Sequence, residues 1–158
     1  MKPRLLAVLF LLMAPATASG QTLADQVVQI ARRNACTKNI ETRTGALQHN
    51  QWELLVSSAR EFITNCLGVG LYIGHENEQE AYALADIAFG LDMQGKFEDS
   101  IPVSTRCVTV KPDAAFCFVE IGRALELLDR PLGARRAYEQ AVNVGGYDRG
   151  KCVSNQIC

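Results

Sequence analysis

The sequence predicts an all-α protein built from antiparallel helix-turn-helix repeats. Two observations support this class: an internal period of 34 residues and apolar residues at helical spacing. Once a predicted leader is removed, about 140 residues remain, enough for one domain with its own core.

The first residues are predicted to form a secretory signal peptide and not part of the fold. Lys2 and Arg4 give a basic start, residues 5–14 are apolar and uncharged, and an Ala-Thr-Ala motif ends at Ala18. We expect residues 1–18 to be removed, with cleavage after Gly20 as the second choice. A buried N-terminal helix is the weaker alternative. A lipid anchor is not expected, because no cysteine lies near the predicted cleavage site.

Charge and cysteine content limit the classes of function. Loss of the two basic leader residues changes the formal net charge from −1 to −3, so nucleic acid is not an expected partner. No second apolar segment is long enough for membrane insertion. The six cysteines follow the leader and contain no Cys-x-x-Cys pair. They predict disulfides in a periplasmic or secreted protein, without a metal or other cofactor.

The leading helix is predicted to begin at Leu23 and to close near Arg33. Apolar residues recur at helical spacing, and two arginines suit a helix end. Residues 37–49 form a weaker helical segment, because threonines and Gly45 disfavour a continuous helix.

The next helix is predicted to start at Trp52, with Asn50 and Glu53 as a capping box. An apolar, glycine-rich insertion follows at residues 67–76. Its burial against the helices is the favoured interpretation, and a place in a partner-binding site is the alternative.

A second capping box, Asn77 with Glu80, is predicted to open a helix that ends near Met93. Its partner spans 97–110, where Pro102 and a β-branched run would by themselves suggest a strand. The repeat period favours a helix there.

Two further helices complete the predicted domain. The first is capped by Asp113 and ends near Leu128, and the second ends near Val144. Residues 145–158 are expected to form an irregular tail that contains two cysteines.

The period aligns two stretches of the chain. The matched pairs are Leu84 with Phe118, Ile87 with Ile121, Ala88 with Gly122, Leu91 with Leu125, and Ser104 with Tyr138. Large, small and aromatic residues at these offsets resemble the tetratricopeptide (TPR) repeat family. The resemblance implies one domain over residues 21–144, with clear repeats at 81–114 and 115–146, one degenerate unit before them and a leading helix.

In TPR arrays the first helix of each repeat lines a concave surface that binds a peptide or helix. By this resemblance the partner-binding residues are Tyr82, Phe89, Met93, Phe116, Val119, Arg123 and Leu127. Aromatic, Met and Arg side chains suit an apolar segment. An equally weighted alternative is that the insertion, the leading helix or the tail already fills this groove.

The disulfide pairing is predicted from hairpin geometry. In an antiparallel helix pair, residues equally far from the turn lie side by side. Two pairs of cysteines are placed evenly, one about Gln51 and one about Pro112. The predicted disulfides are Cys36–Cys66, Cys107–Cys117 and, in the tail, Cys152–Cys158.

No catalytic motif emerges, so an enzyme is not expected. Gly68, Gly70 and Gly74 lack the spacing and the Lys-Ser/Thr pair of a phosphate loop. His49 and His75 have no metal-ligand spacing and are expected at exposed turns or caps.

The function expected from these observations is protein–protein interaction. The chain would be an adaptor, an assembly factor or an accessory subunit of an envelope complex. The alternative is a small secreted or periplasmic inhibitor or immunity-type protein that displays a loop.

Overall fold

The computed structural model describes residues 22–145, and these residues fold into helices alone, as the sequence predicts. The six helices are α1 Leu23–Gln48, α2 Trp52–Asn65, α3 Glu76–Met93, α4 Phe97–Val110, α5 Ala115–Leu127 and α6 Pro131–Gly145. The predicted tail disulfide between Cys152 and Cys158 lies outside the described residues.

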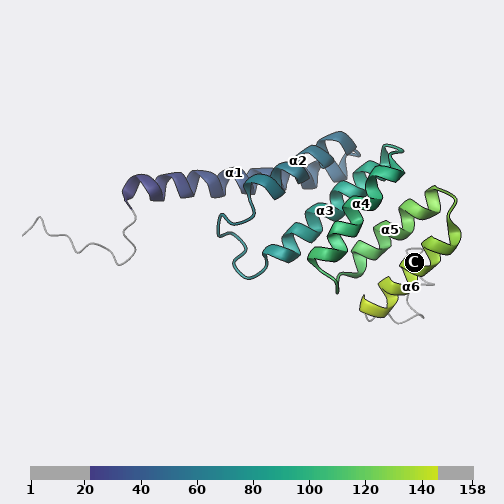
Figure 1. The fold of residues 1–158 in the computed structure, drawn as a ribbon. Helices are drawn as coiled ribbons and strands as arrows, with labels where there is room; N and C mark the ends of the chain where they lie inside the picture. The colour runs from purple at the N-terminus through teal and green to yellow at the C-terminus, as the bar shows by residue number, and fades with distance from the viewer. Residues whose placement is uncertain (1–21, 146–158) are drawn as a thin grey trace, which may run out of the picture.

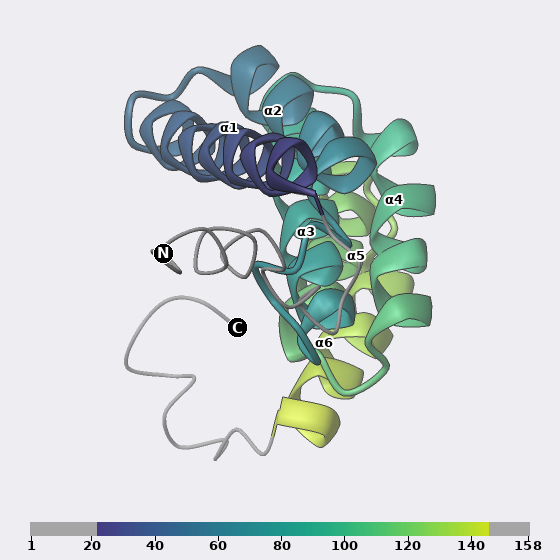
Figure 2. The ribbon, with the colours of Figure 1, turned by 90° about the vertical axis from the view of Figure 1, so that its left-hand side faces the viewer.

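Each helix packs against the next one along the chain, and α3 also packs against α5 (Figure 1). Short turns join α2 through α6 into successive hairpins, apart from the longer segment between α2 and α3. In the turned view α3 and α5 lie on the side of the stack that faces α1, and α4 lies on the outer side (Figure 2). The residues predicted to bind a partner belong to α3 and α5.

The leading helix is longer than the sequence predicted, because α1 continues without a break to Gln48. The expected end near Arg33 is therefore wrong. Threonine hydroxyls in the second half bond back to carbonyls one turn earlier, for example from Thr37 to Arg33 at 3.1 Å, so they are satisfied within the helix. The helix begins with a capping box between Thr22 and Asp25, and its first turns extend beyond the other helices (Figure 1).

The three caps predicted for later helices are wrong. Neither Asn50 nor Asn77 is an N-cap: α2 and α3 follow Gln51 and His75, which make no side-chain cap bond. Asn50 instead takes a left-handed conformation, with φ of 57°, in the turn after α1. Asp113 also caps nothing, since its carboxylate pairs with Lys111 at 2.9 Å.

The strand-like run after Pro102 is helical, as the repeat period predicted. Pro102 lies in the second turn of α4, where the ladder of backbone hydrogen bonds has only begun. Thr105 and Thr109 each bond back to the carbonyl four residues earlier, at 2.8 and 3.0 Å. The β-branched hydroxyls are thus satisfied inside the helix.

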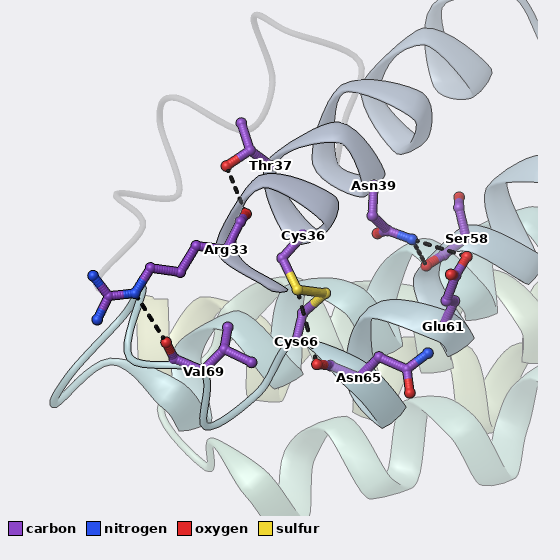
Figure 3. Close-up of a disulfide and its surroundings, with 9 residues drawn as sticks. All are labelled: Arg33, Cys36, Thr37, Asn39, Ser58, Glu61, Asn65, Cys66 and Val69. Carbon is purple, nitrogen blue, oxygen red and sulfur yellow. Dashed lines mark hydrogen bonds between the residues drawn. A yellow bond between two sulfur atoms is a disulfide. The ribbon is translucent and has the colours of Figure 1, made fainter. Parts of the chain in front are cut away.

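Two hydrophobic clusters form the core, and each contains one of the predicted disulfides. The first joins α1, α2 and α3 around Phe62, and the second joins α3, α4 and α5 around Leu84. Cys36 bonds to Cys66 in the first cluster (Figure 3), and the second disulfide is Cys107–Cys117. The Cα atoms of each pair lie 5.5 Å apart, a usual distance for a disulfide.

The segment between α2 and α3 packs largely against the first cluster, which was the favoured interpretation. Leu67, Val69, Leu71 and Tyr72 are partly buried there, and Arg33 of α1 donates to the Val69 carbonyl at 3.3 Å (Figure 3). Ile73 differs from its neighbours, because it is 79% exposed.

Candidate functional site

The side chains predicted to bind a partner come together in pairs across α3 and α5. Tyr82 stacks on Phe116, with ring centres 4.8 Å apart and planes within 14°. The guanidinium of Arg123 lies over the Phe89 ring, 4.5 Å from its centre. The members of each pair are 34 residues apart, so the sequence period corresponds to the step from α3 across to α5. We call the seven predicted residues the α3/α5 face.

Phe89 is the most closely surrounded aromatic residue of this face. Trp52 of α2 meets its ring edge-on at a centre distance of 5.5 Å, while Arg123 covers another side. Phe89 is consequently half-buried. Sequence analysis placed Trp52 at the start of its helix, and its contact with the predicted binding residues was not anticipated.

Apolar side chains at both ends of the α3/α5 face are open to solvent. Tyr82 is 43% exposed at one end, and Met93 and Leu127 are 48% and 49% exposed at the other. Val119 is half-buried. Exposed aromatic and aliphatic side chains that lie together on one face are typical of a protein-binding surface.

Four charged residues that the sequence analysis did not select form a group with Arg123 of the face. Arg43 of α1 pairs with Asp86 of α3 at 3.0 Å, and Arg123 lies 3.5 Å from Glu120 on α5. Asp92 of α3 completes the group. We call these five residues the charged belt. Its signal in the sequence was the period itself, since residues 86 and 120 are also 34 apart.

Burial perturbs the acids of the charged belt. It raises the pKa of Glu120 to about 7; Arg123 opposes the rise, and the negative charges of Asp92 and Asp86 add to it. Burial also raises the pKa of Asp86, against the attraction of Arg43. The pKa of Asp92 is raised by burial as well, with Ser100 and Arg123 opposing.

Hydrogen bonding in the charged belt is incomplete. Six buried side-chain atoms among residues 22–145 lack a hydrogen-bond partner, and five of them belong to the belt. These five are Arg43 Nη1, both carboxylate oxygens of Asp92, Glu120 Oε2 and Arg123 Nη1. Such groups are rare in folded proteins and each demands a physical explanation.

Over residues 22–145 no group of three or more His, Cys, Asp or Glu side chains is arranged to hold a metal ion. None of the helices α1 to α6 combines the length and the apolar character that a membrane crossing requires. His49 and His75 lie exposed at the end of α1 and the start of α3, as predicted.

A second exposed apolar surface occurs at the start of α1. Leu23, Val27 and Ile30 lie at helical spacing and are each more than half exposed. They lie on the part of α1 that extends beyond the other helices (Figure 1). This surface competes with the α3/α5 face as a place for a partner.

No protein-family model, curated protein or solved structure matches this chain. The resemblance to the TPR family therefore stays a prediction based on the residues that carry the period.

Proposed function

We propose that this protein is an exported, TPR-like interaction scaffold that binds a peptide segment or helix of another protein on its α3/α5 face. It would serve as an adaptor, an assembly factor or an accessory subunit of an envelope complex, in the periplasm or outside the cell. The two disulfides fit an oxidising compartment.

The observation that carries this proposal is a face of half-buried and exposed aromatic and aliphatic side chains on the neighbouring helices α3 and α5. Tyr82 with Phe116, and Phe89 with Arg123, are the residue types that dominate binding energy at protein interfaces. Of the helices beneath them, α5 is tied to α4 by the disulfide Cys107–Cys117, and α3 contributes residues to both core clusters. A rigid surface loses little conformational entropy when it binds.

Affinity capture from a periplasmic extract tests the proposal. The mature protein is compared with Phe89→Ala and Met93→Asp on the face, and with Leu132→Ala as a matched control, because Leu132 is an exposed residue of α6. We expect both face variants to lose the captured protein and the control to retain it.

Phe89→Ala should lower the free energy of unfolding by only about 1–2 kcal/mol, less than for a fully buried aromatic. Met93→Asp should leave that free energy nearly unchanged. Capture that survives both face variants would place the binding site elsewhere.

The exposure of Ile73 favours a second candidate, an inhibitor or immunity-type protein that displays the segment before α3. The same capture experiment distinguishes the two candidates. Loss of the partner from Ile73→Asp, with normal capture by Phe89→Ala, would favour the inhibitor.

A further inference from the structure

The charged belt carries more negative than positive charge. Three carboxylates, Asp86, Asp92 and Glu120, face two guanidinium groups, Arg43 and Arg123. Removing an excess charge from water is costly unless it is paired or neutralised. This belt therefore needs one additional positive charge, either a proton or a cation from outside.

Asp92 is the least satisfied residue of the belt. Asp92 is only 4% exposed, yet neither of its carboxylate oxygens has a hydrogen-bond partner among the described residues. Ser100 lies close by, but its hydroxyl donates to the Phe97 carbonyl at 2.9 Å. The charge of Asp92 acts on both Glu120 and Arg123, so it adds to the excess inside the belt.

The ion pair on α5 is also loose. Arg123 Nη1 and Glu120 Oε2 are 3.5 Å apart, beyond a good hydrogen bond, and neither atom has another partner. The guanidinium is instead positioned over Phe89. Glu120 thus keeps unused acceptor capacity, although Oε2 itself is buried.

Part of the belt is accessible from the α3/α5 face. The side chain of Asp86 is 28% exposed and that of Glu120 is 13% exposed. A long side chain that lies on the face can bring its terminal cation to these carboxylates, while its methylene groups cover neighbouring apolar surface.

Apolar surface flanks the belt along α3. Tyr82, Asp86 and Met93 lie at positions i, i+4 and i+11 of one helix. At 1.5 Å per residue, the tyrosine and methionine are about 16 Å apart, and the aspartate lies between them. An extended peptide covers this distance in about five residues.

We propose that the α3/α5 face binds an extended partner segment in which one Lys or Arg lies between apolar side chains, with its cation against Asp86 and Glu120. The inference rests on the proposed function and gives the chemistry of the partner. The flanking apolar side chains contact the Tyr82–Phe116 pair at one end and Met93 with Leu127 at the other.

Glu120 releases a proton when the cation binds. In the free protein Glu120 has a pKa of about 7, set by burial and by the facing groups Arg123, Asp92 and Asp86; Tyr138 of α6 also faces it. An arriving cation favours the ionised carboxylate and releases the proton. The affinity for a Lys-containing segment should then rise about 10-fold between about pH 6 and pH 8, over which lysine keeps its charge.

A phage-displayed library of random peptides, selected against the disulfide-bonded mature chain, tests the inference. We expect peptides that lose binding to Phe89→Ala and that share a Lys or Arg between apolar residues. Selections against Asp86→Asn and Glu120→Gln should lose the preference for a basic residue. Glu98→Gln is the control, because this glutamate is exposed on α4 and should leave the preference intact.

Calorimetric titration of one selected peptide provides a second readout. The peptide is compared with a version in which norleucine replaces its lysine. We expect about a 10-fold gain in affinity with rising pH for the lysine peptide and almost none for norleucine.

The outcomes separate this inference from the proposed function. Selected peptides that bind the α3/α5 face without a basic residue would overturn the inference and leave the proposed function standing. A pH-independent affinity of the lysine peptide would also overturn it. If no peptide is selected, or if binding survives Phe89→Ala, the proposed function fails and the inference fails with it.

Discussion

Replacing Gly122 by Ala tests the register in which α5 and α6 pack. A Cβ atom at this position would lie 2.4–2.8 Å from three ring atoms of Tyr138, whereas ordinary contacts begin near 3.4 Å. The ring cannot retreat freely, because its hydroxyl donates to Glu126 at 2.8 Å. The ring or the helix must therefore move by about 1 Å, and overpacking of this kind costs about 1–3 kcal/mol.

The net effect of Gly122→Ala on the free energy of unfolding is the cost of the clash minus the benefit of alanine in a helix. Gly to Ala in a helix interior stabilises by about 1 kcal/mol, so we expect a net loss of about 1–2 kcal/mol for Gly122→Ala. Gly45→Ala in α1 is the matched control, because nothing lies within 4 Å of its added Cβ. It should gain up to about 1 kcal/mol.

Urea unfolding with the disulfides intact measures both variants, and equal m-values validate the comparison. In a Tyr138→Ala background the penalty of Gly122→Ala should disappear, since the ring that it meets is gone. If Gly122→Ala were as stabilising as Gly45→Ala, the close approach of α5 and α6 at this point would be refuted.

Three further predictions concern covalent structure and charge. Replacing Cys36 and Cys66 together by Ser should cost about 3–4 kcal/mol of unfolding free energy, because the disulfide closes a loop of 30 residues; a loss below about 1 kcal/mol in urea unfolding would contradict this. Folding raises the pKa of Glu120 from 4.5 to about 7. Between these pH values the unfolded chain ionises this carboxyl while the folded chain keeps it protonated, so the contribution of Glu120 to stability is lost as pH rises from 4.5 to about 7. Relative to Glu120→Gln, the wild type should lose up to about 3 kcal/mol between these pH values, and parallel stability curves would argue against a buried acid. Mass spectrometry of the exported protein should find Ser19 or Gln21 at the N-terminus, and an intact leader would disprove the signal peptide.

The elements that recur with the period were the most predictable parts of the fold. A 34-residue repeat fixes where apolar and small residues face neighbouring helices, so it correctly favoured a helix over a strand at residues 97–110. The same spacing pairs Gly122 with Ala88 as a small residue, and in the structure Gly122 lies at a close contact with Tyr138 of α6. Evenly spaced cysteines then predicted which residues the hairpins bring together.

Local capping signals were poor guides by comparison. Asn50 and Asn77 have the right neighbours for capping boxes, but Asn50 takes a left-handed conformation in the turn after α1, and α3 starts two residues earlier than a cap at Asn77 allows. Tertiary packing decided both helix starts. The leading helix was cut short in the prediction because threonines and Gly45 lower intrinsic helix propensity, whereas packing on α2 and the Cys36–Cys66 disulfide hold this part of α1.

The charged belt was missed for a different reason. An acidic residue on a predicted helix is ordinarily assigned to the solvated side, and nothing local marks Asp92 as buried. Arg43 comes from α1, so its pairing with Asp86 depends on how the leading helix crosses the repeats. Only the three-dimensional arrangement brings these charges together.

Site-specific photo-crosslinking in living cells tests the central claim most directly. A photoreactive amino acid is placed at Met93 on the α3/α5 face, at Ile30 on the exposed start of α1, and at Thr105 on α4, all of which are exposed. Our account predicts an adduct of one defined mass from position 93 and none from position 105. An adduct from position 30 alone would contradict it and move the binding surface to α1.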